Sequence, residues 1–94
     1  MSNISTTRVD GVLTISLDRP EKMNALTRDM YADLARALNE AACDFGVRAV
    51  ILTSAGDHFT AGNDIKDFMD HPPTSQDSTV AAFLGAILEF PKPL

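Results

Sequence analysis

The run from Gly56 to Ile65 is the part of the sequence whose residue types and spacing could do chemistry. It reads GDHFTAGNDI, follows an apolar segment, and leads into a possible helix start at Asn63 or Asp64. Backbone N–H groups at a helix start lack partners within the helix, so such a turn can hold an anion or a developing oxyanion. Small residues at Ala61 and Gly62 would let a ligand approach the backbone. The same spacing also fits a tight strand-to-helix turn that binds nothing, and spacing alone leaves both readings open.

Other reactive side chains are weaker candidates. Asp64 is better explained as a helix-start residue, and the remaining acids lie on polar faces, so we assign none of them acid/base work. A lone exposed histidine such as His58 is usually a surface residue. We expect Phe59 and Phe68, which flank the run, to pack in the core. The acids considered are Asp57, Asp64, Asp67, Asp70 and Glu89.

Cysteine usage excludes two kinds of site. Cys43 is the single cysteine of the chain, so it forms no internal disulfide and offers no cysteine partner for a metal. We predict a small buried helix residue rather than a nucleophile, because no histidine is placed to activate it. The sequence predicts no metal site.

Length and charge restrict the class of protein. The chain has 94 residues, 45% of them hydrophobic, and a formal net charge of -5, which describes one globular domain or part of one. Its eight basic residues are spread along the chain, so we expect no nucleic-acid partner. The polar amino terminus lacks a secretion signal, and no apolar run approaches the ~20 residues that span a bilayer. We therefore expect a cytoplasmic protein without a membrane partner.

The first half of the sequence predicts a hairpin followed by a helix. Two strand-like runs, Ile4–Val9 and Val12–Leu17, flank an Asp-Gly pair that fits a tight hairpin turn. From Leu26 to Ala41 apolar residues recur at helical spacing. Thr27 can cap this helix, and Gly46 stands where a left-handed stop residue is expected.

The second half predicts a buried strand and two further helices. The run 48–53 does not alternate and reads as a strand covered on both faces. A short helix can follow Asp64, and Ser78 can cap a longer one that ends before Pro91. The apolar stripe of that longer helix is expected to be core. It consists of Val80, Phe83, Leu84, Ile87 and Leu88.

This order of elements indicates an α/β layered fold with parallel strand pairing. Three strands are few for a sheet whose last strand needs cover on both faces. We therefore expect the chain to be the front part of a larger domain.

Three blocks of sequence resemble the opening of the crotonase (enoyl-CoA hydratase/isomerase) superfamily. They are Arg19–Leu26, Val47–Thr53 and Phe59–Ile65, and the likeness resumes at Phe90–Leu94. The resemblance implies the N-terminal part of a crotonase-like (ββα) spiral fold, with residues 1–94 forming an incomplete domain. It further implies an acyl-CoA thioester whose carbonyl oxygen sits in an oxyanion hole of two backbone N–H groups.

The resemblance also implies a role for particular residues. The first oxyanion-hole donor would be the backbone N–H of Asn63, whose side-chain identity should matter little. No separate cofactor is implied, because coenzyme A enters as the substrate thioester. The positions implied to contact coenzyme A are Ala61, Gly62, Asp64 and Ile65 in one segment and Lys22, Met23, Ala25 and Leu26 in another.

The family's second oxyanion-hole loop and its catalytic glutamates have no counterpart in these residues, so we expect the isolated chain to be inactive. The parent activity implied first is 2-enoyl-CoA hydration. Δ3-Δ2-enoyl-CoA isomerisation is the alternative within the family. A non-catalytic fragment that binds coenzyme A or a partner chain is the alternative from another class. The family assembles trimers and hexamers, which implies a homo-oligomer for the full-length protein.

Overall fold

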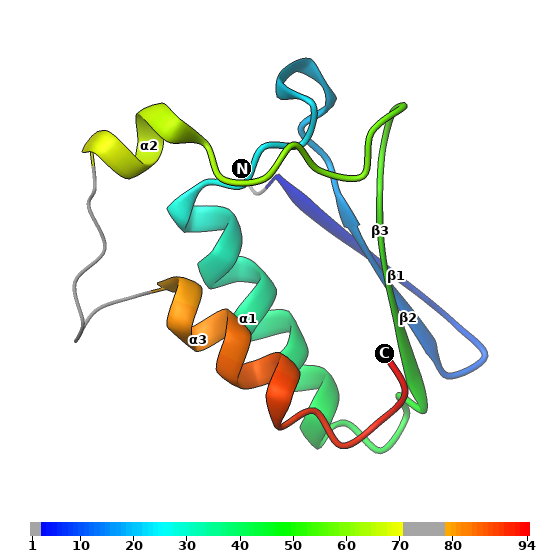
Figure 1. Cartoon of the computed structure of the whole chain (residues 1–94). Helices are drawn as coiled ribbons and strands as arrows, with labels where there is room; N and C mark the ends of the chain where they lie inside the picture. Colours follow the sequence, from blue (N-terminus) through cyan, green and yellow to red (C-terminus); the bar gives the residue numbers. More distant parts are fainter. Residues whose placement is uncertain (1–2, 71–78) are drawn as a thin grey trace.

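The computed structural model describes residues 3–70 and 79–94. A three-stranded sheet forms one layer, and the two longer helices form the other (Figure 1). The elements are β1 (Ile4–Val9), β2 (Val12–Leu17), the 3₁₀ turn η1 (Pro20–Lys22), α1 (Arg28–Cys43), β3 (Ala49–Ser54), α2 (Ile65–Asp70) and α3 (Thr79–Leu88).

The sheet has the strand order β1-β2-β3 and combines both pairing directions. β1 and β2 are antiparallel, and their turn places Asp10 and Gly11 at positive φ (53° and 83°). β2 and β3 are parallel, with Leu13 beside Val50. The predicted hairpin and the predicted parallel pairing are both confirmed.

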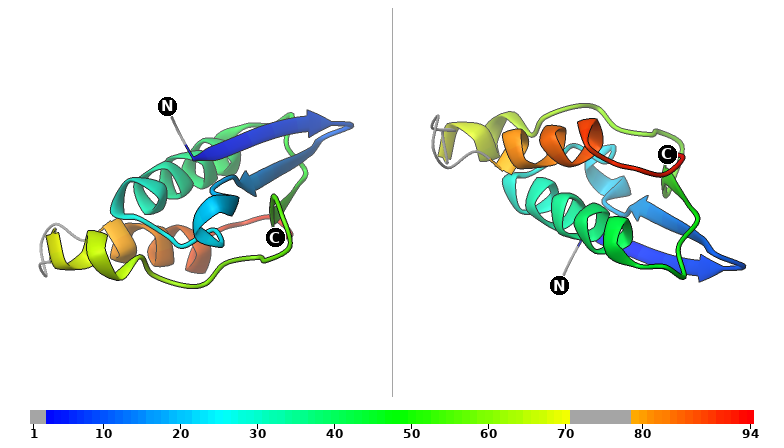
Figure 2. Two further views of the ribbon diagram at one scale, coloured as in Figure 1. Left: turned by 90° about the horizontal axis from the view of Figure 1, so that it is seen from above. Right: turned by 90° about the horizontal axis from the view of Figure 1, so that it is seen from below.

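The core lies between the sheet and α1. Ile15 and Leu17 of β2 are at most 1% exposed and belong to the same buried cluster as Met30 and Leu34 of α1. Thr27 caps α1, as predicted, because its side chain accepts a hydrogen bond from the Met30 N–H at 3.2 Å. Seen from above and below, α1 and α3 lie side by side on the same face of the sheet (Figure 2).

Among the described residues β3 is covered on one face only, which agrees with the expectation that three strands do not supply the cover this strand needs on both faces. Val50 is 3% exposed, whereas its neighbour Ile51 is 51% exposed. Successive side chains of a strand point to opposite faces. Val50 belongs to the buried cluster that α1 covers, and α3 lies beside α1 on the same face of the sheet (Figure 2). In residues 3–70 and 79–94, the face that carries Ile51 is therefore open.

The end of α1 differs from the prediction in two ways. Gly46 is not a left-handed stop residue, because the helix already ends at Cys43 and Gly46 does not have a positive φ. Instead, the Lys92 ammonium group donates hydrogen bonds to the Ala41 and Asp44 carbonyl oxygens at 2.6 and 2.7 Å. The prediction that Cys43 is buried is also wrong, since this last helical residue is exposed.

α3 presents only part of its apolar stripe to α1. Val80, Phe83 and Ile87 pack against the core, but Leu84 is 53% and Leu88 85% exposed. The stripe is therefore only partly core. The predicted cap, Ser78, lies outside the described residues. No helix within the described part of the chain is long and apolar enough to cross a membrane.

Candidate functional site

Two segments far apart in the sequence run side by side at the amino-terminal end of α1. One follows η1, and the other connects β3 to α2 (Figure 1). They form a short parallel bridge that pairs Leu26 with Asn63. Three backbone hydrogen bonds join them, from Ala61 N–H to Met23 O (3.0 Å), from Leu26 N–H to Gly62 O (2.7 Å) and from Asp64 N–H to Leu26 O (2.8 Å).

The main-chain N–H of Asn63 differs from those of its neighbours in its hydrogen bonding. The amides of Ala61 and Asp64 are used in the bridge, and the Gly62 N–H donates to the Thr60 hydroxyl at 3.1 Å. Among residues 3–70 and 79–94, nothing accepts a hydrogen bond from the Asn63 N–H. This one donor of the segment is therefore available to a ligand or to water.

The backbone beside this donor is open. Gly62 has a φ of 93°, and a Cβ built on it would meet no atom within 4 Å. Ala61 and Asn63 are exposed. The described part of the chain thus combines a donor without an acceptor and open space at the neighbouring Gly62, as a turn that receives a ligand oxygen requires.

Asp64 directly precedes α2, and its side chain hydrogen-bonds to the first turn of this helix. One of its carboxylate oxygens accepts from the Asp67 N–H at 2.9 Å, and the other accepts from the Arg19 guanidinium at 2.7 Å. The Asp67 N–H, and after it Arg19, lower the pKa of Asp64. The carboxylate is therefore ionised and engaged at neutral pH, which agrees with its interpretation as a helix-start residue.

Asn24, to which the sequence analysis gave no role, joins the two segments. It is fully buried (0% exposed), and its side-chain NH₂ donates to the carbonyl oxygens of Ala55 and His58, each at 2.7 Å. Its side-chain oxygen accepts from the Arg19 N–H, and its main-chain oxygen accepts from the Thr60 hydroxyl, both at 2.7 Å. Every polar group of this side chain is satisfied, so Asn24 fixes the first segment to the loop after β3.

The four candidate residues of the first segment have different surroundings. Lys22 and Met23 are exposed, and Met23 adopts a left-handed conformation with a φ of 53°. Ala25 is half-buried, whereas the side chain of Leu26 lies in the core. Lys22 and Met23 can therefore meet a ligand with their side chains, while Leu26 takes part through its backbone.

Tyr31 of α1 is a second residue that the sequence analysis missed. Its hydroxyl donates a hydrogen bond to the side-chain oxygen of Asn63. Its ring lies edge-on to Phe68 at 6.4 Å between centroids and tilted against Phe83 at 5.4 Å. Tyr31 lies in the first turn of an amphipathic helix, where nothing in the local sequence indicates a polar partner. Only the fold reveals this contact.

Exposed apolar side chains surround the bridge. The expectation that Phe59 packs in the core is wrong, because this ring is 52% exposed, whereas Phe68 does pack against the core. Met23 is 52% and Ile65 75% exposed. Apolar surface of this kind near a backbone donor suits a ligand with a polar group on an aliphatic body.

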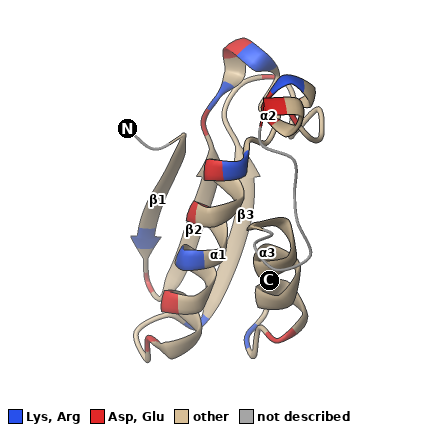
Figure 3. Ribbon diagram, turned by 90° about the vertical axis from the view of Figure 1, so that its left-hand side faces the viewer, with Lys and Arg blue, Asp and Glu red and all other residues tan. Residues whose placement is uncertain are grey.

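Charges of both signs occur around the site. η1 carries Glu21 and Lys22, and α2 carries Lys66 and Asp67 (Figure 3). Within residues 3–70 and 79–94, no three His, Cys, Asp or Glu side chains gather as a metal site would require. His58 is exposed.

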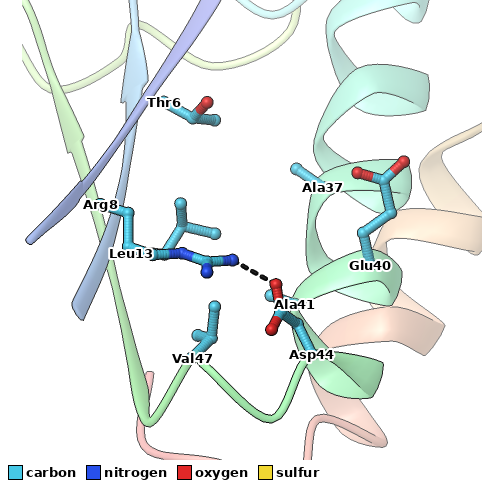
Figure 4. Close-up of a pocket in the computed structure, with 8 residues that line it drawn as sticks. All are labelled: Thr6, Arg8, Leu13, Ala37, Glu40, Ala41, Asp44 and Val47. Carbon is cyan, nitrogen blue, oxygen red and sulfur yellow. Dashed lines mark hydrogen bonds and ion pairs between the residues drawn. The ribbon is translucent and has the colours of Figure 1, made fainter. Parts of the chain in front are cut away.

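A hollow of about 280 Å³ lies at the other end of α1. Arg8 of β1 and Asp44 form an ion pair across it (Figure 4). The residues assigned to the bridge do not line it, so the hollow is separate from the candidate site. Its lining residues are Thr6, Arg8, Leu13, Ala37, Glu40, Ala41, Asp44 and Val47.

Comparison with known proteins gives consistent matches. The family model described as enoyl-CoA hydratase/isomerase matches residues 7–94. Human enoyl-CoA delta isomerase 2 is 36% identical over 95 residues, which cover 94% of this chain. OdaA from Pseudomonas aeruginosa superimposes with a TM-score of 0.92 at 50% identity over 99% of the chain. An enoyl-CoA hydratase/isomerase from Pseudoalteromonas atlantica T6c gives 0.90 at 41% identity over 98% of the chain.

The chain spans only part of these proteins. It covers 24% of the human relative, 38% of the P. aeruginosa structure and 37% of the P. atlantica structure. The observed strands and helices therefore correspond to a minor part of each larger fold.

Proposed function

Because the chain belongs to the enoyl-CoA hydratase/isomerase family, we propose that its two bridged segments form part of an acyl-CoA site. In this proposal the Asn63 N–H donates a hydrogen bond to the thioester carbonyl oxygen. The coenzyme A portion, which enters as part of the substrate, contacts Lys22, Met23, Ala25 and Leu26 in one segment and Ala61, Gly62, Asp64 and Ile65 in the other. Residues 1–94 are then the N-terminal section of an incomplete crotonase-like domain.

A single observation carries the proposal. Among the described residues nothing accepts from the Asn63 N–H, which lies between two paired amides, and a Cβ at Gly62 would meet no atom within 4 Å. A fixed donor costs no reorganisation when negative charge develops on the thioester oxygen, so it stabilises an enolate-like state. Both hydration and double-bond isomerisation of an enoyl-CoA pass through such a state in this scheme.

Two parent reactions share this half of the site. Hydration of a 2-enoyl-CoA is the reaction that the sequence resemblance implied first. Isomerisation is the second candidate, and the name of the human relative, enoyl-CoA delta isomerase 2, favours it. The proposed site supplies thioester polarisation for either reaction, and the acid/base groups that separate them lie outside the proposed site.

Two coenzyme A compounds test the thioester contact. Acetyl-CoA has the carbonyl oxygen, whereas S-ethyl-CoA is a thioether without it. We expect the chain to bind acetyl-CoA more tightly in calorimetry, by about threefold to tenfold for one hydrogen bond. Equal affinities for the two compounds would exclude a thioester contact.

Two substitutions at one position locate the donor. Asn63→Pro removes the main-chain N–H, which no described residue uses, and we expect it to abolish the preference for acetyl-CoA. Asn63→Ala keeps that N–H, so it should lose less of the preference. An Asn63→Pro variant that folds and still prefers acetyl-CoA would place the donor elsewhere.

A turnover assay tests whether the chain alone can catalyse. We propose that the chain alone binds acyl-CoA without catalysing, because one donor without acid/base groups lowers the barrier too little. We expect no detectable hydration of crotonyl-CoA and no isomerisation of 3-hexenoyl-CoA at high protein concentration. Measurable turnover by the pure chain would show that its own acids suffice.

A further inference from the structure

The side chain of Asn63 is tied to α1. Its oxygen accepts a hydrogen bond from the hydroxyl of Tyr31, which is 32 positions away and only 7% exposed. The Tyr31 ring is held between Phe68 and Phe83. The donor hydroxyl therefore has a fixed place, and it fixes the direction of the Asn63 side chain.

An untethered asparagine at this position would compete with a ligand. Asparagine side-chain oxygens commonly accept hydrogen bonds from their own main-chain N–H or from the N–H two residues ahead. In the described part of the chain nothing accepts a hydrogen bond from the Asn63 N–H. A free side-chain oxygen could occupy this donor or repel the oxygen of an arriving carbonyl.

We propose that Tyr31 is a positioning residue that holds the Asn63 side-chain oxygen away from the main-chain N–H of Asn63 and so keeps this donor open. The inference rests on the proposed function and adds to it a residue of α1 that does not touch the substrate. Burial raises the pKa of Tyr31, so its hydroxyl keeps its proton and remains a donor at neutral pH.

A set of four proteins tests the proposal with the same pair of probes. They are the wild type, Tyr31→Phe, Asn63→Ala and the double variant, each titrated with acetyl-CoA and S-ethyl-CoA. Tyr31→Phe removes the hydroxyl and keeps the ring against Phe68 and Phe83. We expect it to reduce the preference for acetyl-CoA about threefold or more, the effect of losing one hydrogen bond.

The double variant separates positioning from general damage. Asn63→Ala removes the competing oxygen, so adding it to Tyr31→Phe should restore the preference to the value of Asn63→Ala alone. A structural defect caused by Tyr31→Phe would not be rescued in this way. As a neutral control, Asn39→Ala lies at an exposed position of α1 and should keep the wild-type preference.

The outcomes distinguish the inference from the proposed function. A wild type that does not discriminate between the probes overturns the proposed function. A discriminating wild type together with an unchanged Tyr31→Phe, or with a double variant that is not rescued, overturns the role of Tyr31 alone.

Hydrogen exchange in the wild type keeps the proposal testable if Tyr31→Phe does not fold. We expect the Asn63 amide to exchange faster than the amides of Ala61 and Asp64, which are hydrogen-bonded in the bridge. An Asn63 amide as protected as these two would mean that the donor is already occupied, and would overturn the inference.

Discussion

Arg19 and Asp64, 45 positions apart in the sequence, form an ion pair of 2.7 Å where the two bridged segments meet. Both side chains are only 16% exposed. The same guanidinium nitrogen of Arg19 also donates to the Ala25 carbonyl oxygen at 3.0 Å. One side chain thus holds the first segment and the start of α2 together, with the Asn63 donor next to it in sequence.

This ion pair predicts a loss of stability in acid. The Asp67 N–H and Arg19 lower the pKa of Asp64 in the folded chain, whereas the unfolded chain has the usual value of about 3.9. A lowered folded pKa contributes stability above the unfolded pKa, and this contribution is lost as the pH falls through the folded value. Urea unfolding should therefore give a free energy that declines below about pH 4. Asp64→Asn should be less stable at pH 7 and should show a shallower decline.

Asp44 provides a matched variant for this measurement. The Gly46 N–H, and after it Arg8, lower the pKa of Asp44 at the far end of α1. Asp44→Asn should flatten the acid decline in the same way, and the double variant should flatten it further. An Asp64→Asn variant with the pH dependence of the wild type would contradict the assigned contacts.

The buried Asn24 predicts a large effect from a single substitution. Among the described residues, Asn24→Ala leaves the Ala55 carbonyl oxygen and the Arg19 N–H without their partner, and each such loss costs about 1–3 kcal/mol. The His58 carbonyl oxygen keeps the hydrogen bond from the Ser54 hydroxyl. The substitution also places alanine at a φ of 57°, which costs about 1 kcal/mol more. Urea unfolding should show a loss of about 3 kcal/mol or more, which is enough to unfold a marginal domain.

An exposed asparagine gives the control. Asn39 lies at an exposed position inside α1, where alanine is the better helix former. Asn39→Ala should be neutral or stabilising by a few tenths of a kcal/mol. Equal losses for the two variants would mean that the Asn24 hydrogen bonds contribute nothing specific.

Local patterns in the sequence were sufficient for much of the fold. The Asp10-Gly11 pair located the hairpin, and Thr27 with the apolar spacing after it located α1. Both predictions depend on contacts between residues close in sequence, for which spacing is direct evidence. The run from Gly56 to Ile65 was located as a candidate site in the same way.

The features that organise the site depend on residues far apart in sequence. Asn24 reads as an ordinary turn residue, yet its partner His58 is 34 positions away. Tyr31 received no role from the sequence, yet its hydroxyl donates a hydrogen bond to the side-chain oxygen of Asn63. A long-range polar contact leaves no periodic trace in one sequence, so only the folded chain reveals it.

The end of α1 also depends on a contact between residues far apart in sequence, and this contact can be tested. Lys92 donates to the carbonyl oxygens of Ala41 and Asp44, which also accept from the main-chain N–H groups of Asp44 and Val47, and no left-handed glycine takes part. Lys92→Met keeps most of the aliphatic length but removes both charged hydrogen bonds, so we expect a loss of about 1.5–3 kcal/mol in urea unfolding. Lys66→Met at an exposed position of α2 should change the free energy of unfolding by at most about 0.5 kcal/mol. A similar result for both variants would argue against capping by Lys92.

The same substitution, glycine to alanine, should have opposite effects on stability at Gly62 and Gly85. A methyl group would meet no atom within 4 Å at either Gly62 or Gly85, so neither substitution causes a clash. Gly85 lies inside α3, where alanine loses less backbone entropy on folding, and Gly85→Ala should stabilise the chain by about 0.5–1 kcal/mol. Gly62 has a φ of 93°, which an L-residue adopts only with strain, and Gly62→Ala should destabilise by about 1 kcal/mol or more. The midpoint temperature of thermal unfolding should therefore rise for Gly85→Ala and fall for Gly62→Ala. If Gly62→Ala were also stabilising, the turn beside Asn63 would not have the backbone conformation that leaves its N–H free.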